Sequence, residues 1–298
     1  MKAIEIINYG EPDVARVRTV KRPNRRPGEV LIQVVASSIN PVDIKHMTPG
    51  TIQKINSFPM VLGWDISGIV IEADKQSSFS LGERVVALHP QGSWQQVISI
   101  PENQLIKLPD SIDFISGASV PLASSTALQA LRRLQLSSNE NLLVIGAAGS
   151  VGYYALQIAK EMGITVAGLV RNEDQKSSIE SETAKIYTIN ESLPKFDAVF
   201  DTAGVLDRID FIRKGGKLVT VSDDTIESQV IAHTSFADHN YVKVNPADLS
   251  HIIRLISEGK IKTRIAKSYP FNDIQTALTQ AKQSGNKGKI ILVFKGSS

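Results

Sequence analysis

The sequence predicts an α/β protein in which a compact β-barrel of short strands precedes a doubly wound parallel sheet. Two observations indicate this fold class. The hydrophobic period changes from strand-like to helical near residue 114, and apolar strands alternate with helices from there on. The 298 residues are enough for two domains that each bury a core.

The N-terminal part consists of β-rich runs separated by turn residues such as Gly10, Pro12 and Pro27. The expected strands cover residues 1–7, 30–35, 61–72, 84–88 and 94–100. Strands at this spacing predict a compact β-barrel.

The second half alternates between helices and buried strands. Apolar residues at helical spacing predict one helix over 114–136, and Gly163 is the expected cap of a helix over 150–162. The expected strands are 141–146, 164–170, a run near residue 186, 198–201 and 217–221. The tail is expected to form helices over 246–258 and 273–283 and a strand over 289–294. Strands that are apolar on both faces indicate a parallel sheet.

The composition excludes several classes of protein. The chain has no cysteine, which removes disulfides, thiolate nucleophiles and thiolate zinc sites, and its five histidines lack metal-binding spacing. The net charge is +3 without a long basic block, so we expect no nucleic-acid partner. No apolar run reaches the length of a membrane helix, and the first residues are charged too early for a signal peptide. We therefore expect a cytoplasmic protein with no membrane partner.

The most informative segment joins the strand over 141–146 to the helix over 150–162. Its glycines have distinct roles: Gly146 permits a tight turn, Gly149 lets the backbone approach a pyrophosphate, and Gly152 removes a side chain where helix packs on strand. Free N–H groups at the helix start attract phosphates. A turn that only packs is the alternative interpretation. The predicted dinucleotide site consists of Gly146, Ala147, Ala148, Gly149, Ser150, Val151 and Gly152.

The next strand indicates which dinucleotide is bound. Its tip carries Arg171, and an arginine there can bind a 2′-phosphate that an acid would repel. Lys176 is a second candidate for the phosphate. Glu173 and Asp174 leave an alternative open, because a strand that ended two residues later would place an acid at the ribose. We expect NADPH, with NADH less favoured.

Several short blocks follow one another in a defined order along nearly the whole chain. They are Asn40 to Asp43, Gly63 to Gly68, Gly82 to Val85, Gly92 to Pro101, Ser119 to Ala127, Ala147 to Lys160 and Lys287 to Ile290. In this order the blocks resemble the zinc-free quinone oxidoreductase (zeta-crystallin-like) branch of the medium-chain dehydrogenase/reductase superfamily.

The resemblance implies a GroES-like catalytic and substrate domain over residues 1–115, rejoined by about 262–298, and a Rossmann NADP-binding domain over 116–261. It also implies a substrate cleft between them and, by analogy, a homodimer. Zinc-dependent relatives have a cysteine near position 40, a histidine near 64 and a cysteine or aspartate near 122. This chain has Asn40, Trp64 and Leu122 there, so we expect no zinc and no alcohol dehydrogenation.

The remaining chemistry is hydride transfer from NADPH to a quinone or an electrophilic, α,β-unsaturated carbonyl compound. Asn40, Asp43 and Trp64 are the candidate catalytic residues by the resemblance, and Asn40 and Thr126 are candidate cofactor contacts. Each has a plainer interpretation: Asn40 before Pro41 suits a turn, Asp43 can cap or pair, and Trp64 can belong to the core.

Two other functions stay open. One is a zinc-free alcohol or enoyl-thioester reductase, although the tyrosine that the enoyl-thioester branch uses is missing from residues 43–59. The other is an NADPH-binding sensor or structural protein without turnover, because no indispensable acid, base or nucleophile stands out. Residues 172–189 and 223–240 depart from the family pattern, so the substrate, the proton donor and the oligomeric state do not follow from the sequence.

Overall fold

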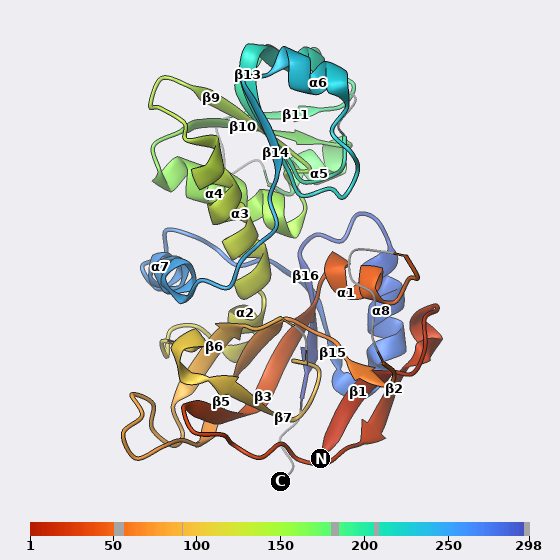
Figure 1. Cartoon of the computed structure of the whole chain (residues 1–298). Coiled ribbons are helices and arrows are strands. Elements are labelled where there is room, and N and C mark those ends of the chain that lie inside the picture. Colours follow the sequence, from red (N-terminus) through yellow and green to blue (C-terminus); the bar gives the residue numbers. More distant parts are fainter. Residues whose placement is uncertain (51–56, 91, 180–184, 206–208, 295–298) are drawn as a thin grey trace. The chain divides into compact units, whose positions relative to one another are not determined.

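The computed structural model describes residues 1–50, 57–90, 92–179, 185–205 and 209–294 (Figure 1). Contacts divide the chain into two compact units. The first unit comprises Met1–Leu122 and Val244–Ser298, and the second comprises Ala123–Lys243. This division differs from the predicted domains in residues 116–122 and 244–261, and the functional roles of the two domains remain a prediction.

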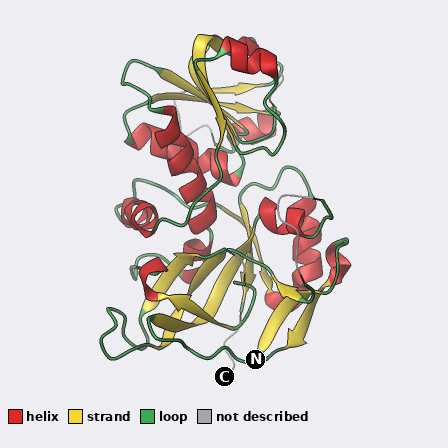
Figure 2. Cartoon of the chain, viewed as in Figure 1, coloured by secondary structure: helices red, strands yellow, loops and turns green. Residues whose placement is uncertain are grey.

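The first unit is rich in β-strands (Figure 2). Its strands are β1 (Lys2–Ile6), β2 (Ala15–Thr19), β3 (Glu29–Ile39), β4 (Met60–Val61), β5 (Asp65–Glu72), β6 (Arg84–Leu88), β7 (Val97–Pro101), β8 (Ile106–Lys107), β15 (Ile265–Pro270) and β16 (Lys289–Val293). In the described residues, a larger sheet has the order β15-β16-β3-β5-β6-β8 with β7 paired to β3, and a smaller sheet has the order β2-β1-β4. The last strand, β16, pairs antiparallel with β3, so residues from the two ends of the chain share one sheet.

Helices flank these sheets. They are α1 (Pro41–His46), α2 (Phe114–Ala118), α7 (Pro246–Ser257) and α8 (Ile274–Lys282), with 3₁₀ turns at Pro12–Val14, Glu102–Gln104 and Phe271–Asp273. Helix α7 packs against β6 and β8, which is why residues 244–261 belong to the first unit.

The core of the first unit forms from the apolar side chains that its strands bury. Ile4, Ile32 and Trp94 are fully buried in it. Phe294, just after β16, stacks on Phe271 with ring centroids 5.1 Å apart. Each buried side chain of this size contributes about 1.5–3 kcal/mol, so the C-terminal segment stabilises the unit that the N-terminus begins.

The second unit alternates strands and helices. Its elements are β9 (Asn141–Ile145), α4 (Ser150–Glu161), β10 (Thr165–Val170), α5 (Glu173–Ser177), β11 (Ile186–Thr188), β12 (Phe196–Asp201), a 3₁₀ turn (Ile209–Phe211), β13 (Ile212–Thr220), α6 (Ser228–His233) and β14 (Phe236–His239), preceded by α3 (Pro121–Leu134). The described strands form a parallel sheet in the order β11-β10-β9-β12-β13-β14. Strands β9, β10 and β12 are almost wholly buried, as two-sided burial of a parallel sheet requires. The predicted α/β fold class, with a doubly wound parallel sheet, is confirmed.

Two local predictions differ from the structure. The helix expected over 114–136 is divided into α2 and α3, because Pro121 cannot continue a helix but suits the first position of a new one. Residues 223–240, for which the sequence offered no structural counterpart, contain α6 and the edge strand β14. This strand was missed because its four residues show little alternation of polar and apolar side chains.

Among the described residues, the helices fall short of the length and apolar character that a membrane span needs.

Candidate functional site

The turn between β9 and α4, which we call the glycine turn (residues 146–152), depends on its glycines for shape. Gly146 has φ +75°, and a Cβ there would lie 2.6 Å from Thr202 Oγ1. A Cβ on Gly152 would lie 2.4 Å from the Gly146 carbonyl oxygen, closer than real Cβ atoms approach. A Cβ on Gly149 would meet the same oxygen at 3.2 Å. The glycines therefore bring the start of α4 close to the end of β9.

Backbone hydrogen bonds divide the seven predicted residues into two groups. The N–H groups of Gly146 and Ala147 donate to Leu169 O at 3.0 and 3.2 Å, and Gly149 N–H donates to Gly146 O at 2.9 Å. Ala147 and Ala148 are buried. These residues shape the turn.

The first turn of α4 supplies the donors. Tyr153 N–H bonds back to Gly149 O at 2.8 Å, whereas the N–H groups of Ser150, Val151 and Gly152 precede the first acceptor that the helix itself can offer. The N-cap residue is Gly149, which has no side chain to satisfy them. Together with the positive end of the helix dipole, these N–H groups make the turn fit the diphosphate of a dinucleotide.

The glycine turn follows β9, and the strand order of the sheet reverses between β9 and β12, because β10 and β11 lie on one side of β9 and β12 to β14 lie on the other. Ligands of open parallel sheets bind at this place. The end of β12 is also organised there, because Asp201 accepts hydrogen bonds from Ala203 N–H at 3.0 Å and Thr220 Oγ1 at 2.8 Å. Thr202 Oγ1 donates to Ile145 O at 2.7 Å and so joins β12 to the turn. Asp201 and Thr202 were not predicted as part of this site, although polar residues at the end of a buried strand could have indicated them.

Arg171 follows the last residue of β10 and is exposed. Its backbone N–H donates to Gln175 Oε1 at 3.0 Å, while its guanidinium has no bonded partner among the described residues. Glu173 and Asp174 lie in the first turn of α5, beyond the strand tip. The strand therefore ends where the NADPH prediction needs it to end.

The other predicted cofactor contacts in the second unit are already engaged within the chain. Lys176 Nζ donates to Glu191 Oε1 at 2.8 Å, and this contact lowers the pKa of Glu191. Thr126 is buried in α3, and its carbonyl accepts a hydrogen bond from Asn240 Nδ2 at 3.2 Å. The roles of both residues remain predictions.

The first unit contains a buried group that we call the polar cluster: Ser38, Asn40, Asp43, Asp65 and Lys289. Asn40 Nδ2 donates to Asp65 Oδ2 at 2.9 Å and to Ser38 Oγ at 3.3 Å, and Asn40 Oδ1 accepts from Lys289 Nζ. Lys289 Nζ also forms an ion pair with Asp65 Oδ2 at 3.2 Å. Every polar atom of the Asn40 amide thus has a partner inside the cluster.

Strand pairing explains how Lys289 reaches the cluster. Ile290 of β16 lies opposite Ile39 of β3, so Lys289 comes beside Asn40 although 249 positions separate them. The sequence analysis missed Asp65 and Lys289 as members of this group. A charged residue at the start of each of two largely apolar strands was the available signal.

Asp43 closes the start of α1. Its Oδ2 accepts Asn40 N–H at 2.8 Å, and its Oδ1 accepts Gly63 N–H at 3.1 Å. Burial raises the pKa of Asp43 to about 7, because desolvation outweighs the effect of these two donors. The Asp65 carboxylate raises this pKa further, and the Lys289 ammonium lowers it. The capping role that the sequence left open is therefore present, and the catalytic role remains a prediction.

Trp64 lies directly before β5 and is half-buried. Its Nε1 is buried without a hydrogen-bond partner among the described residues, whereas its carbonyl accepts His89 N–H at 2.9 Å. A buried indole N–H without a partner is costly, so Trp64 offers one donor that a ligand can satisfy.

The positions that hold zinc in the zinc-dependent relatives do not fit the ion. Asn40 is held by Asp65 and Lys289, Trp64 presents an indole, and Leu122 contributes its backbone N–H to Asp65 Oδ1 at 2.7 Å. Within the described ranges, His, Cys, Asp and Glu side chains form no group of three or more that could hold a metal ion.

Comparisons with known proteins extend over both units. A family model for the alcohol dehydrogenase GroES-like domain matches residues 26–110, and one for zinc-binding dehydrogenases matches residues 178–292. The chain is 29% identical to the chloroplastic NADPH-dependent alkenal/one oxidoreductase of Arabidopsis thaliana, over 98% of this chain and 79% of that protein. It is 27% identical to the quinone oxidoreductase of Homo sapiens, over 99% and 98% of the two chains. The solved quinone oxidoreductase of Coxiella burnetii superimposes with a TM-score of 0.88 at 26% identity, covering 99% of each chain.

Proposed function

Because the chain belongs to the medium-chain dehydrogenase/reductase superfamily of oxidoreductases, we propose that it reduces quinones or α,β-unsaturated carbonyl compounds with NADPH and without zinc. One observation carries this proposal above the others. Among the described residues, the N–H groups at the start of α4 have no capping side chain at the point where the strand order reverses, and the glycines beside them admit no side chain.

The second unit is the proposed cofactor domain. Gly146, Ala147, Ala148 and Gly149 shape the diphosphate site, and the N–H groups of Ser150, Val151 and Gly152 bind it. The guanidinium of Arg171 binds the 2′-phosphate, and Thr126 contacts the cofactor. When bound, NADPH supplies the hydride. Lys176 contributes to the phosphate site through its charge, which its ion pair with Glu191 partly neutralises.

The proposed substrate domain lies within the first unit and comprises residues 1–115 and about 262–298. The indole N–H of Trp64, which has no hydrogen-bond partner among the described residues, orients a substrate carbonyl. Asn40 and Asp43 hold the backbone next to Trp64, since Asp43 accepts the N–H groups of Asn40 and Gly63, and the Asn40 amide donates to Asp65. The acceptor is already electron-poor, so the chain needs to position it rather than activate it through a metal.

Purified protein mixed with NADPH and a panel of ortho-quinones, para-quinones and enones tests the proposal. We expect saturable NADPH binding by calorimetry and loss of absorbance at the nicotinamide band with at least one acceptor. Binding of NADPH without consumption on any acceptor would favour a sensor instead. Absence of heat with NADPH and NADH in both redox forms would remove the whole proposal.

A matched variant separates chemistry from binding. Trp64→Phe keeps an aromatic side chain but removes the indole N–H, so KM for the acceptor should rise while the Kd for NADPH stays within about twofold. An unchanged KM would contradict the role proposed for Trp64.

A further inference from the structure

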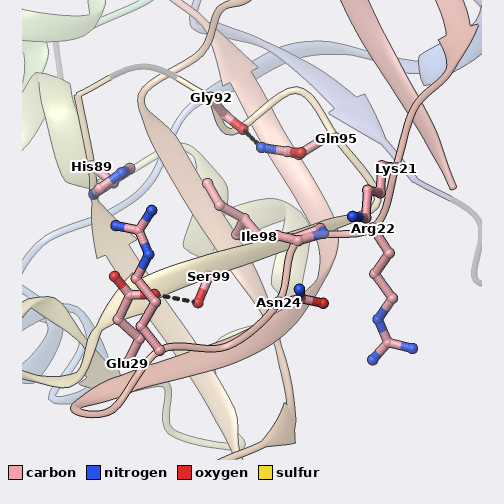
Figure 3. Close-up of a pocket in the computed structure, with 11 residues that line it drawn as sticks. Lys21, Arg22, Asn24, Glu29, His89, Gly92, Gln95, Ile98 and Ser99 are labelled. Carbon is pink, nitrogen blue, oxygen red and sulfur yellow. Dashed lines mark hydrogen bonds between the residues drawn. The ribbon is translucent and has the colours of Figure 1, made fainter.

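A pocket of about 630 Å³ lies in the first unit, between the segment 21–29 and strand β7 (Figure 3). Its lining includes Ile98 and Ser99 of β7, and Ile98 pairs with Ile32 on β3. Since Ile32 precedes Asn40 by eight residues, the pocket floor lies roughly 25 Å along the strand from the polar cluster. The floor of the pocket is therefore distant from the polar cluster, while its lining residue His89 adjoins Trp64, because His89 N–H donates to Trp64 O at 2.9 Å.

Positive charge is concentrated around this pocket. Lys21, Arg22 and Arg26 line it, and none of their side chains has an acidic partner among the described residues. The lining contains one carboxylate, that of Glu29, so its net charge with neutral His89 is +2. A pocket with this excess attracts an anion.

The neighbouring Arg25 shows why these charges stay unpaired. It forms ion pairs with Glu72 at 3.2 Å and Asp74 at 2.7 Å, and so occupies the acids beside the segment. Its Nη1 also donates to the carbonyls of Arg26 and Glu29 at 3.1 and 3.3 Å. These bonds hold the segment 21–29 on the sheet, whereas Lys21, Arg22 and Arg26 lack an acidic partner among the described residues.

The rest of the lining is suited to more than a bare anion. Figure 3 shows Lys21 and Arg22 on one side, Glu29 and His89 on the other, and Ile98 between them. Ser99 Oγ donates to Glu29 Oε2 at 2.7 Å, which satisfies part of that carboxylate. Asn24 and Gln95 add amide groups that can donate and accept hydrogen bonds. An apolar floor with amides at its edge fits a heterocyclic base, and the volume lies in the range of small-molecule sites.

We propose that this pocket binds a nucleoside diphosphate, with its phosphates on Lys21, Arg22 and Arg26 and its base over Ile98. Two guanidinium groups suit this ligand because each can bind two phosphate oxygens at once. The site lies outside the glycine turn, so it is a second nucleotide site.

Titration of ADP onto the protein saturated with NADPH tests the proposal, because NADPH occupies the glycine turn. We expect saturable binding of ADP, and the double variant Arg22→Glu/Arg26→Glu should weaken it by about tenfold or more. The matched control is Arg16→Glu/Lys75→Glu, which makes the same charge change at exposed positions outside the pocket. The control should change the Kd for ADP by less than about twofold, and both double variants should keep their NADPH affinity.

Three results would overturn the proposal: no saturable ADP binding in the presence of NADPH, an equal loss in both double variants, or inorganic pyrophosphate binding as tightly as ADP. The last would mean that the pocket recognises charge without a base. Should NADPH itself fail to bind, the proposed function fails, and the same ADP titration on the unliganded variants still decides the second site.

Discussion

The glycine turn and the polar cluster have the same local arrangement of elements, but they differ in whether the chain itself satisfies the polar groups at the helix start. In each, a buried strand leads directly into a helix: β9 into α4 in the second unit, and β3 into α1 in the first. At α1 the Asp43 carboxylate accepts the N–H of the N-cap residue Asn40. At α4 the N-cap residue is Gly149, which has no side chain that could accept a hydrogen bond from the first turn. The chain closes one helix start with its own groups and leaves the other open.

Because of this difference, we expect the polar cluster to affect the stability of the fold and the glycine turn to affect the binding of a ligand. Groups that satisfy one another inside the protein contribute to folding, and a missing partner there leaves a buried charge or donor uncompensated. Donors that the chain leaves free contribute when a ligand supplies the acceptor. Substitutions in the polar cluster should therefore lower the stability first, and substitutions in the glycine turn should weaken NADPH binding first.

The largest expected effect is that of Lys289→Met. The substitution leaves the buried Asp65 carboxylate without its ion-pair partner, which should destabilise the protein by about 3–5 kcal/mol. Thermal unfolding should show a Tm lower by roughly 10 °C. The control is Lys289→Met combined with Asp65→Asn, which removes both charges and should recover part of the loss. A Tm equal to that of the wild type would mean that the cluster does not stabilise the first unit.

The next effect concerns the glycine turn. In Gly152→Ala the new Cβ would meet the Gly146 carbonyl oxygen at 2.4 Å and Ala147 Cα at 2.8 Å, and backbone atoms cannot move aside as a side chain can. The Kd for NADPH should rise by about 100-fold, or about 2.7 kcal/mol. Gly149→Ala is the matched control, because its Cβ would lie 3.2 Å from that oxygen, and its Kd should rise by less than about tenfold. Equal effects of the two variants would contradict the geometry of the turn.

The two regions also differ in how far the sequence predicted them. The glycine turn is local: its strand, glycines and helix follow one another within about a dozen residues, so spacing alone indicated its structure. The shape of the turn depends on backbone hydrogen bonds of Gly146, Ala147 and Gly149 to β10 and within the turn itself. No sequence pattern shows these bonds.

The polar cluster is non-local. Asn40 and Asp43 belong to one short block, but Asp65 and Lys289 join them only through the pairing of β3 with β5 and β16. Asp65 lies in the sequence block from Gly63 to Gly68, and Lys289 lies in the block from Lys287 to Ile290. The partners of these charged residues depend on the strand register, which the sequence leaves undetermined. Local motifs could be predicted, and the contacts between distant segments could not.

A smaller effect follows from the titration of Asp43. Its pKa is about 7 in the folded protein and near its ordinary value of 3.8 in the unfolded chain. Between these values the folded state binds a proton that the unfolded state lacks, so stability falls as the pH rises from about 4 to 7. The loss between pH 5 and 7 should be about 2 kcal/mol, measured by denaturant unfolding. Asp43→Asn should remove this dependence, whereas an unchanged slope in the variant would assign it to another group.

The smallest effect concerns Arg171, which directly follows β10. Arg171→Asp places a negative charge where the 2′-phosphate of NADPH is proposed to bind, and the Kd for NADPH should rise by about tenfold, or about 1.4 kcal/mol. The Kd for NADH, which lacks that phosphate, should change by less than about threefold. Lys176→Gln is the control, because the Lys176 ammonium already binds Glu191 and its loss should change the Kd for NADPH by less than about threefold. Equal losses for NADPH and NADH in Arg171→Asp would contradict the phosphate contact, and a larger loss in Lys176→Gln would transfer that contact to the lysine. In either case the open helix start of α4 would still bind the diphosphate, and only the choice between the two cofactors would change.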